Sequence, residues 1–497
     1  MLERLPARSF ILLETVGRLA DQLGVSAYVV GGIVRDLLLG IGNLDLDLVI
    51  EGDGIAFARA LADEIGGHVK AHERFGTAVV IVPDGVKLDI ATARTESYKH
   101  PAALPTVQPS SIKPDFSRRD FTINTLAISL NGRRFGELID CYGGQRDLTD
   151  KTIRVLHNRS FVEDPTRVFR AIRFAQRFGF RLGKETLVLI KAAVKRDLFH
   201  RLSGQRLLNE LILLFSEKEP RKAVARLGEL GLLRFIHPSI KWSPRLGSLL
   251  KSVEDALDGY KIAALNWTDR KVGVGGSAPR GTPAGRVPGG KFADRGPIAQ
   301  SRAMGDESVS RPVLGSSGPP PTRMNAWVVY FMALMEVLPP RAVGETLKRL
   351  TMPEREAEKI RAGHAAANTV LRRLAKRPLP KPSETYRALT GLADETLLLL
   401  LAKAKPESVK RQVSAYLTIY RHVKPALTGA DLKALGLEPG PIYKKIFDRL
   451  LDARLSGEVK TETDERELVK RIARSNHSGN GRPRVSGANG RINNPTR

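Results

Sequence analysis

The chain has 497 residues, 42% of them hydrophobic, which is enough for about two to four domains with buried cores. Its 80 Lys and Arg outnumber its 53 Asp and Glu, and the charge of +27 favours a nucleic-acid partner over a merely basic protein with basic tails. The single cysteine excludes an intramolecular disulfide, and no apolar run can cross a bilayer, so we expect a cytoplasmic protein without a membrane partner.

The first predicted unit is a strand, a glycine pair and a helix. An amphipathic helix is expected over 10–23. Residues 27–30 then read as a buried strand, Gly31 and Gly32 follow, and a helix covers 33–39. A helix N-terminus behind a glycine pair offers backbone N–H groups to a phosphate.

Two carboxylates share one face of the next predicted strand, 44–48. Asp45 and Asp47 alternate there with leucines that can bury against a core. Like charges this close repel unless a cation lies between them, and Mg²⁺ suits one or two carboxylates plus substrate phosphates. An ordinary edge strand with a solvated face is the alternative.

A third carboxylate, Asp89, stands on a predicted hairpin. A helix is expected over 55–65, followed by strands over 77–82 and 86–91. If the strands are neighbours, Asp89 joins the first two carboxylates and helps to hold a second metal or accepts the proton of an attacking hydroxyl. A solvated strand aspartate explains it equally well, and residues 94–109 read as a loop.

A mostly apolar helix is predicted to open at 117 and to run to about 129. Arg118 and Arg119 near its start can clamp a triphosphate, and Asp120 can accept a ribose hydroxyl. The alternative for Asp120 is a helix N-cap, and these residues alone do not decide between the two. Residues 143–148 read as a turn.

A row of arginines follows a helix-start signal at Asp164 and Pro165. Asp caps helices, and Pro is preferred at their first position. The arginines recur at helical spacing opposite an apolar face and form a positive rail: Arg167, Arg170, Arg173 and Arg177. A solvated basic face and a merely capping Asp164 are the alternatives.

Most of the remaining chain reads as helices. They continue to about 260 and resume over 325–420 without a catalytic signature. Residues 272–321 predict a disordered insert, which is either a flexible RNA tether or an insertion without function. Residues 428–441 read as a helix–turn–helix unit that suits a backbone phosphate, or as a plain turn. Residues 475–497 predict a basic, disordered tail.

Four stretches resemble, in the family's order, the signatures of class II tRNA nucleotidyltransferases and bacterial poly(A) polymerases: 30–47, 118–124, 163–167 and 203–211. The resemblance is strong over about 28–211 and weak over about 428–468. It implies an α+β fold, with an N-terminal nucleotidyltransferase (polymerase-beta-like) head containing a mixed β-sheet, followed by an all-helical neck, body and tail. The implied division is 1–141 head, 142–217 neck with the base-reading helix, 218–271 and 322–425 body, 272–321 insert, 426–474 tRNA-binding tail and 475–497 basic tail.

The resemblance also implies roles for the candidate residues. It assigns Mg²⁺ to Asp45 and Asp47, phosphates to Gly31, Gly32 and Arg35, the ribose to Arg119 and Asp120, the base to Asp164 and Arg167, and the phosphate or the nucleotide's rim to Arg170 and Arg173. Arg206 and Glu210 are expected to buttress the base-reading helix, and Arg35 has the alternative of pairing with the neighbours of Asp36.

The base-reading role agrees with the chemistry of the bases. Cytosine and adenine both present an amino donor beside a ring-nitrogen acceptor, which a carboxylate and a guanidinium match. Uracil and guanine have the opposite polarity and would leave buried groups unpaired, at about 1–3 kcal/mol each. Asp164 and Arg167 would therefore serve both CTP and ATP.

The implied reaction is template-independent addition of CCA, or of its terminal A, to the 3′ end of tRNA from CTP and ATP, with release of pyrophosphate. Residues 155–161 look more like A-adding relatives than CCA-adding ones. A poly(A) polymerase acting on other RNA 3′ ends is the alternative enzyme. A non-catalytic RNA-binding protein is the alternative from another class, although it has no use for paired carboxylates. The sequence does not set the oligomeric state.

Overall fold

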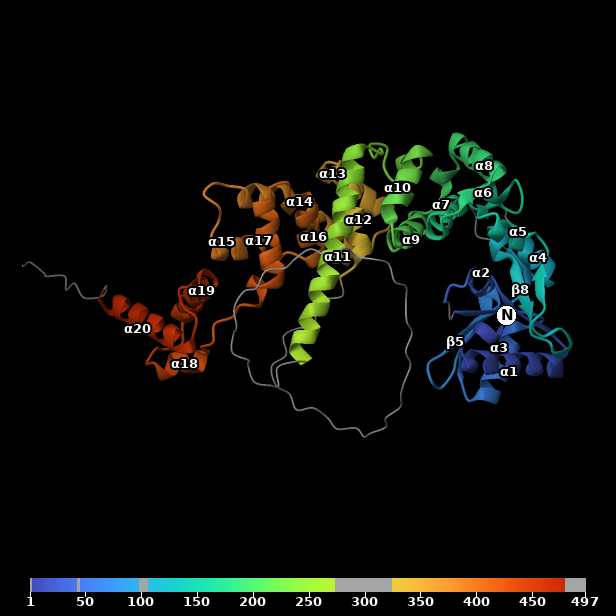
Figure 1. Cartoon of the computed structure of the whole chain (residues 1–497), viewed down its shortest axis with the longest axis horizontal. Helices are drawn as coiled ribbons and strands as arrows, with labels where there is room; N and C mark the ends of the chain where they lie inside the picture. Colours follow the sequence, from blue (N-terminus) through green and yellow to red (C-terminus); the bar gives the residue numbers. More distant parts are fainter. Residues whose placement is uncertain (1, 43–44, 98–105, 273–323, 479–497) are drawn as a thin grey trace, which may run out of the picture.

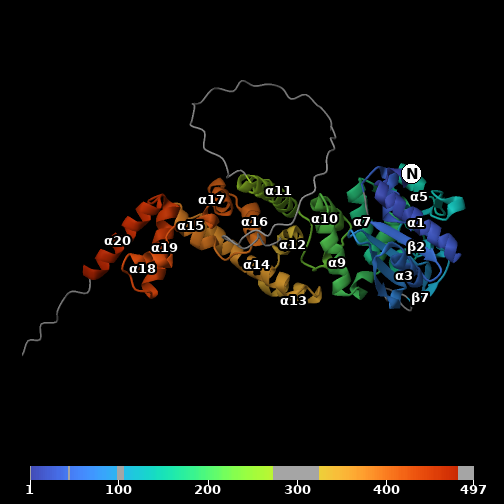
Figure 2. The ribbon, with the colours of Figure 1, turned by 90° about the horizontal axis from the view of Figure 1, so that it is seen from below.

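The computed structural model describes residues 2–42, 45–97, 106–272 and 324–478. These residues form an arch, with a β-sheet head at one end, a tail of helices at the other and helices between them (Figure 1). Viewed from below, the parts follow one another from head to tail in chain order (Figure 2). None of the described helices is both long enough and apolar enough to cross a membrane.

The head is built on a seven-stranded mixed sheet. Its strands lie in the order β3 (His68–His72), β4 (Thr77–Ile81), β5 (Lys87–Thr92), β2 (Leu46–Glu51), β1 (Ser26–Val30), β8 (Leu126–Ser129) and β9 (Leu138–Asp140). Only β2 and β5 are parallel, and the other neighbouring strands pair antiparallel. The fold class predicted from the sequence, an α+β head followed by mostly helical parts, is confirmed.

Short helices cover the sheet because alternate strand residues on each face are apolar. The head helices are α1 (Ala7–Leu23), α2 (Gly32–Leu39), α3 (Gly54–Ile65), α4 (Ile112–Ser117) and α5 (Gly144–Thr149). Apolar residues of α1 and α3 pack on one face of the sheet, and Phe116 of α4 packs on the other against Tyr28 and Val30. β6 (Arg94–Ser97) pairs with β7 (Thr106–Pro109) in a separate two-stranded sheet.

The neck and body continue the apolar core of the head. The neck contains α6 (Ser160–Glu163), α7 (Thr166–Phe178), α8 (Lys184–Lys195) and α9 (Gly204–Phe215). The body contains α10 (Pro220–Glu229), α11 (Pro244–Val272), α12 (Ala326–Met335), α13 (Pro340–Arg349), α14 (Glu354–Leu374), α15 (Pro382–Leu389), α16 (Asp394–Lys403) and α17 (Glu407–Thr418). Because one cluster of buried apolar side chains runs through all three parts, head, neck and body are joined by packing.

The tail has its own small core. Its helices are α18 (Gly429–Ala434), α19 (Pro441–Ser456) and α20 (Glu462–Ser478). Leu432, Ile446 and Leu450 belong to an apolar cluster separate from that of the body. The 3₁₀ helices of the chain are short: η1 (Leu2–Arg4), η2 (Glu73–Phe75), η3 (Thr122–Asn124), η4 (Gly132–Arg134), η5 (Leu198–Arg201), η6 (Leu233–Phe235) and η7 (Tyr420–His422).

One glycine marks a close approach between neck and body. Gly204, the first residue of α9, lies so near the end of α13 that a Cβ there would overlap the carbonyl oxygen of Arg349. Next to it, the Thr351 hydroxyl donates to Gln205 Oε1 at 3.0 Å. A larger residue at 204 would therefore push the two helices apart.

Several predicted elements are wrong in type. The helix predicted over 117–129 is replaced by the end of α4, by η3 and by the strand β8, because a short, fully buried apolar run fits a central strand as well as a helix. The loop predicted at 94–109 contains β6 and β7, and the turn predicted at 143–148 is largely α5.

Other predictions need smaller corrections. The neck is not all-helical, because β10 (Thr152–Ile153) pairs with β11 (Arg181–Leu182). α20 runs to Ser478, into the predicted disordered tail. The rest of that tail and nearly all of the predicted insert lie outside the described residues, as does Leu44 of the predicted Asp-bearing strand.

Candidate active site

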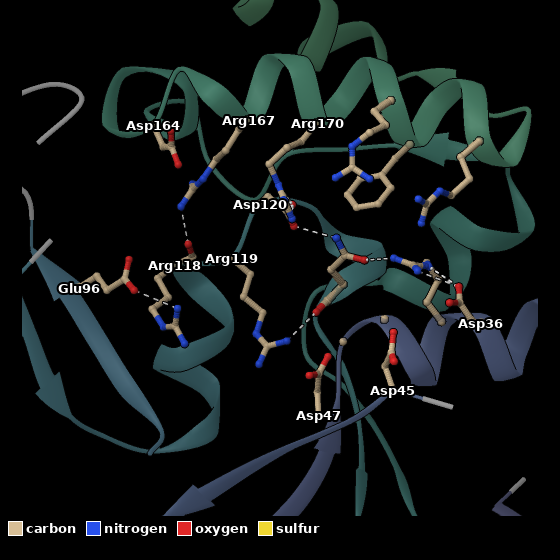
Figure 3. Close-up of a pocket in the computed structure, with 17 residues that line it drawn as sticks. Asp36, Asp45, Asp47, Glu96, Arg118, Arg119, Asp120, Asp164, Arg167 and Arg170 are labelled. Carbon is tan, nitrogen blue, oxygen red and sulfur yellow. Dashed lines mark hydrogen bonds and ion pairs between the residues drawn. The ribbon is translucent and has the colours of Figure 1, made fainter. Parts of the chain in front are cut away.

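A pocket of about 550 Å³ lies between the head and the neck helix α7 (Figure 3). Its walls come from α2 and the glycine before it, from the start of β2, from Glu96 of β6, from the residues around η3, and from Asp164 and α7. The predicted site residues that line it are Gly31, Gly32, Arg35, Asp45, Asp47, Arg119, Asp120, Asp164, Arg167, Arg170 and Arg173. The acidic pair of the head and the predicted base-reading pair of the neck thus share one cavity.

Asp45 immediately precedes β2, Asp47 is its second residue, and both point into the pocket (Figure 3). Asp47 is in register with Asp89 on the parallel neighbour β5. Burial, followed by the charge of Asp89, raises the pKa of Asp47 to about 6; Asp45 adds to the shift, and Arg119 opposes it. Asp89 itself is exposed and is not among the described residues that line the pocket, so its catalytic role stays a prediction.

The acidic pair fits a divalent metal ion. Burial is the main reason why the ionised form of Asp47 is unfavourable, and the charges of Asp89 and Asp45 add to it, so a cation bound at Asp47 would offset this cost. Within the described ranges, no group of three or more His, Cys, Asp or Glu is arranged to hold a metal. Asp45 and Asp47 would therefore leave most coordination positions to substrate oxygens and water.

Arg119 reaches across to the glycine turn before α2. Gly31 has a φ of 72°, which favours glycine, and a Cβ there would lie 2.9 Å from Nη1 of Arg119. That nitrogen donates to the backbone oxygen of Asn124 at 3.2 Å. The guanidinium thus occupies space that a side chain at position 31 would take, on the same side as Asp47 (Figure 3).

Arg35 is largely engaged by protein groups. Its Nε donates to Asp36 Oδ1 at 2.8 Å and its Nη1 to Asn124 Oδ1 at 2.7 Å. Its guanidinium also lies 4.6 Å from the ring centroid of Phe178 on α7. Arg35 therefore pairs with Asp36 itself rather than with the neighbours of Asp36, and its predicted phosphate role has to operate from this fixed position.

Asp120 connects the head to α7. One of its oxygens accepts from the backbone N–H of Phe121 at 2.9 Å and from Asn124 Nδ2 at 2.8 Å. The other accepts from Nε of Arg170 at 2.8 Å. Burial would raise the pKa of Asp120, but Arg170 and these hydrogen bonds together lower it. Asp120 is thus an ionised link between head and neck as well as a pocket residue.

Asp164 caps α7 and lines the pocket at the same time. Its Oδ1 accepts from the backbone N–H of Thr166 at 3.0 Å, from the Thr166 hydroxyl at 2.6 Å and from Nη2 of Arg206 at 2.7 Å. The capping alternative is therefore present together with the pocket position. Arg206 on α9 holds the carboxylate in place, in agreement with its predicted buttressing role.

Arg167 is the second residue of α7 and is buried. Its Nη1 donates to the Ser160 hydroxyl at 2.9 Å, and its Nη2 donates to the backbone oxygen of Arg118. Both contacts fix the guanidinium close to Asp164 at one end of the pocket (Figure 3).

Three of the four arginines of α7 are paired with acids rather than forming a bare positive rail. Arg177 donates to Glu217 through Nε at 2.9 Å and Nη2 at 2.6 Å, and Arg173 Nη1 donates to the same carboxylate at 3.3 Å. Arg173 Nε and Glu210 Oε2 face one another at 3.9 Å, both buried and without a hydrogen-bond partner in the described structure. Burial raises the pKa of Glu210.

Sequence reasoning missed several pocket or supporting residues. Asp115, Asn124, Phe174 and Glu217 each hold or contact an arginine of the site. Asp115 carried a signal, because an acid three and four residues before two arginines on one helix can pair with both. Glu217 carried none, since its partner Arg177 is 40 residues away.

Two family models match the chain. The "Poly A polymerase head domain" matches residues 27–154, which include the sheet and the acidic pair. The "Probable RNA and SrmB- binding site of polymerase A" matches residues 179–242, behind α7.

Curated relatives match nearly the whole chain. The A-adding tRNA nucleotidyltransferase of Geobacter sulfurreducens is 42% identical over 96% of this chain, which spans 48% of that relative's length. The A-adding tRNA nucleotidyltransferase of Halalkalibacterium halodurans is 30% identical over 92% of this chain and 91% of its own length. The chain therefore spans about half of the first relative and most of the second.

Solved structures show the same arrangement of head and helices. An apo form of a CCA-adding enzyme superimposes with a TM-score of 0.72 at 29% identity, over 95% of this chain and 97% of the other. The Thermotoga maritima CCA-adding enzyme complexed with tRNA has a TM-score of 0.67 at 28% identity, over the same shares of the two chains.

Proposed function

This chain belongs to the class II tRNA nucleotidyltransferase/poly(A) polymerase family, and on that premise we propose that it adds the terminal A to the 3′ end of tRNA, taking AMP from ATP and releasing pyrophosphate. The observation that carries the proposal is the single pocket that joins Asp45 and Asp47 of the head to Asp164 and Arg167 of the neck. A nucleotide that bridges them would have its phosphates near the acidic pair and its base at the start of α7.

Relatives support addition of A over the other activities of the family. Those at 42% and 30% identity over nearly the whole chain are both A-adding tRNA nucleotidyltransferases. A CC-adding enzyme of Deinococcus radiodurans is 38% identical, but over only 41% of this chain. Residues 155–161, between the head and α7, also look like those of A-adding relatives.

The metal proposed at Asp45 and Asp47 is Mg²⁺. Two carboxylates with room for substrate oxygens suit this ion, which keeps few protein ligands. When bound there, Mg²⁺ would favour ionisation of the tRNA 3′-hydroxyl and neutralise the leaving pyrophosphate. At the start of α2, Gly32 is proposed to donate its backbone N–H to the phosphates, and Gly31, whose own N–H donates to the Leu126 carbonyl at 3.0 Å, leaves room for them because it has no side chain.

The choice of base is proposed to rest on Asp164 and Arg167. A carboxylate accepts from the amino group of adenine or cytosine, and a guanidinium donates to the neighbouring ring nitrogen. Both side chains are fixed by Arg206, Ser160 and the backbone of Arg118, so they present a constant pattern to the base. ATP and CTP are the nucleotides that fit.

A primer-extension ladder tests this function. The protein is incubated with tRNA transcripts that end before CCA, after CC or after CCA, and with each radiolabelled nucleotide in turn. We expect one A on the transcript ending in CC and no addition to the complete transcript. Asp45→Ala is the control and should lose incorporation while tRNA binding, measured by filter retention, is preserved.

The other outcomes identify the alternatives. Addition of CCA to the shortest transcript would make the protein a CCA-adding enzyme. A long run of A would make it a poly(A) polymerase. Binding of tRNA without any incorporation would leave only the non-catalytic RNA-binding function.

A further inference from the structure

Asp115 is a fully buried carboxylate next to the pocket that the proposed function does not use. It lies on α4, just before the arginines of the 118–124 segment, and has no exposed surface. A buried carboxylate is costly unless it is paired, so its partners indicate what it is for.

Two neighbouring arginines share this carboxylate. Oδ1 accepts from Nε of Arg118 at 3.0 Å and from the backbone N–H of Arg94 at 3.2 Å. Oδ2 accepts from Nε of Arg119 at 3.2 Å and from Nη2 of Arg119 at 3.1 Å. The helical spacing of three and four residues brings both arginines to the same acid.

The bonds to Oδ2 leave one end of Arg119 facing the pocket. The remaining nitrogen, Nη1, donates to the backbone oxygen of Asn124 and lies against the bare Cα of Gly31. Figure 3 shows this end of the guanidinium directed toward Asp47. Asp115, the Asn124 carbonyl and the absence of a side chain at Gly31 therefore fix the guanidinium beside the acidic pair.

Arg119 depends on such a partner because its side chain is only 16% exposed. Desolvation lowers the pKa of Arg119, and the charge of Asp115 is the largest opposing influence. Without the carboxylate, the guanidinium would be more favourable in a rotamer that reaches water than beside Gly31.

We propose that Asp115 is a positioning residue for nucleoside triphosphate binding, which holds the guanidinium of Arg119 between Gly31 and Asp47 so that it meets the nucleotide. The proposal rests on the proposed function, in which the nucleotide occupies this pocket. Asp115 acts through Arg119 and has no contact with substrate of its own, since it is buried behind the arginine.

The head contains a matched control. Asp147 is also buried, at 2% exposure, and it also accepts from an arginine, Arg154 Nε, at 3.1 Å. It accepts from the Thr122 hydroxyl at 2.6 Å as well. Neither Asp147 nor Arg154 is among the described residues that line the pocket. Asp147→Asn therefore removes a comparable buried charge from a place where no arginine faces the nucleotide.

The test is a double-mutant cycle between Asp115→Asn and Arg119→Ala. Asn has nearly the volume of Asp but no charge, so Arg119 loses its charge-assisted bonds without a cavity being formed. We expect the KM for ATP on a tRNA ending in CC to rise about 10- to 100-fold, with a smaller change in kcat. Asp147→Asn should stay near wild type. In the Arg119→Ala background, Asp115→Asn should have little further effect.

Additive effects of the two substitutions, or a KM for Asp115→Asn equal to that of Asp147→Asn, would overturn the proposal. Circular dichroism establishes that each variant is folded. If Asp115→Asn is not, the cycle is run with Asp115→Glu, which keeps the charge but moves it. Asp115→Glu is expected to raise the KM for ATP by a smaller factor, and to have no such effect in the Arg119→Ala background. Additive effects of Asp115→Glu and Arg119→Ala would again contradict the proposal.

The same cycle separates this proposal from the proposed function. If wild-type protein adds nothing to any RNA, the proposed function fails. The coupling between Asp115 and Arg119 is then measured in the binding of ATP with Mg²⁺ by isothermal titration calorimetry. Non-additive losses of affinity support the positioning role, and additive losses contradict it.

Discussion

Asp47 combines a functional position with an electrostatic cost. Its pKa is raised to about 6 by burial and by the charge of Asp89. An acid whose pKa is higher in the folded state binds its proton more tightly there, so stability falls as the pH rises from about 4 to about 6. At neutral pH Asp47 is ionised, so the stability of the metal-free protein is lowered by the full cost of this charge.

Asp47→Asn should therefore stabilise the metal-free protein. At pH 7.5 in EDTA we expect an increase of about 1–3 kcal/mol in the free energy of unfolding, because about two pKa units of unfavourable ionisation are removed. At pH 4 the difference should shrink, since folded Asp47 is then protonated. Thermal melting at both pH values checks this, with the exposed Asp63→Asn on α3 as control. An Asp47→Asn protein that melts below wild type at pH 7.5 would contradict the electrostatic assignment.

Asp164 has two roles that one substitution can separate. Asn also caps helices well, so Asp164→Asn should preserve α7 while removing the carboxylate that is proposed to face the base. We expect the preference for ATP over GTP and UTP to fall by about tenfold. The measurement is incorporation from each nucleotide into tRNA ending in CC. The control is Thr166→Val, which removes the hydroxyl bond to Asp164 and should keep the preference. Unchanged selectivity in Asp164→Asn would reduce this residue to a helix cap.

The positions of single site residues were predictable where a local sequence pattern brings the reactive groups together. Alternation with leucines was enough to pair Asp45 with Asp47, and the structure places both in the pocket. The alternatives at Asp120 and Asp164 could not be decided from sequence, because each residue makes local bonds and lines the pocket as well. The partner of Asp120 is Arg170, 50 residues away, which no local pattern indicates.

At the scale of elements, α7 holds the neck against the head. Its arginines contact the head at two points: Arg170 pairs with Asp120, and Arg167 donates to the backbone of Arg118. Arg35 of α2 adds a third contact through the ring of Phe178. Two of the four arginines in the predicted positive rail, Arg167 and Arg170, therefore hold the neck against the head, and the other two pair with Glu217.

Arg170→Met should weaken this attachment because it leaves Asp120 buried without its cation. We expect a loss of about 1.5–3 kcal/mol in the free energy of unfolding, measured by urea denaturation. Adding Asp120→Asn should recover part of the loss, since the unpaired charge is then gone. Arg177→Met, which removes an arginine from the exposed end of the same helix, is the control and should cost less. A double variant less stable than Arg170→Met would contradict the pairing.

Helices were predictable where their apolar pattern repeats over enough residues. The helices of the body have the expected places, because an apolar stripe sustained over several turns has few alternatives. β8 was mistaken for part of a helix since its four residues are all buried and show no alternation. β6 and β7 were missed because they pair only with one another.

At the scale of the whole molecule, the net positive charge and the distance between head and tail both bear on how an RNA would bind. Head and tail lie at opposite ends of the arch, so an RNA that reaches both must follow the protein over much of its length (Figure 1). With a net charge of +27, that contact should be largely electrostatic.

Binding of tRNA should accordingly weaken steeply with salt. We expect the affinity to fall by about 10³-fold between about 50 and 200 mM monovalent salt, because binding releases cations from the RNA phosphates and this release is less favourable at high salt. Filter binding at a series of salt concentrations gives the slope. Asp45→Ala should have the same slope, because that carboxylate is proposed to bind the metal and, being negative, adds no phosphate contact. A flat dependence would show that the positive surplus does not face RNA.

The overall order of the parts was predictable because each signature stands in a fixed place along the chain. The arched shape was not, since it depends on close approaches between helices that sequence patterns do not reveal.

The contact at Gly204 has a consequence for substrate length. Because α9 touches the end of α13 with no side chain between them, the neck cannot slide along the body without breaking the joint. The distance between the pocket and the far end of the body is thereby held constant. An RNA whose stem is too short or too long for that distance would not present its 3′ end to the acidic pair, even if its last nucleotides are those of the substrate.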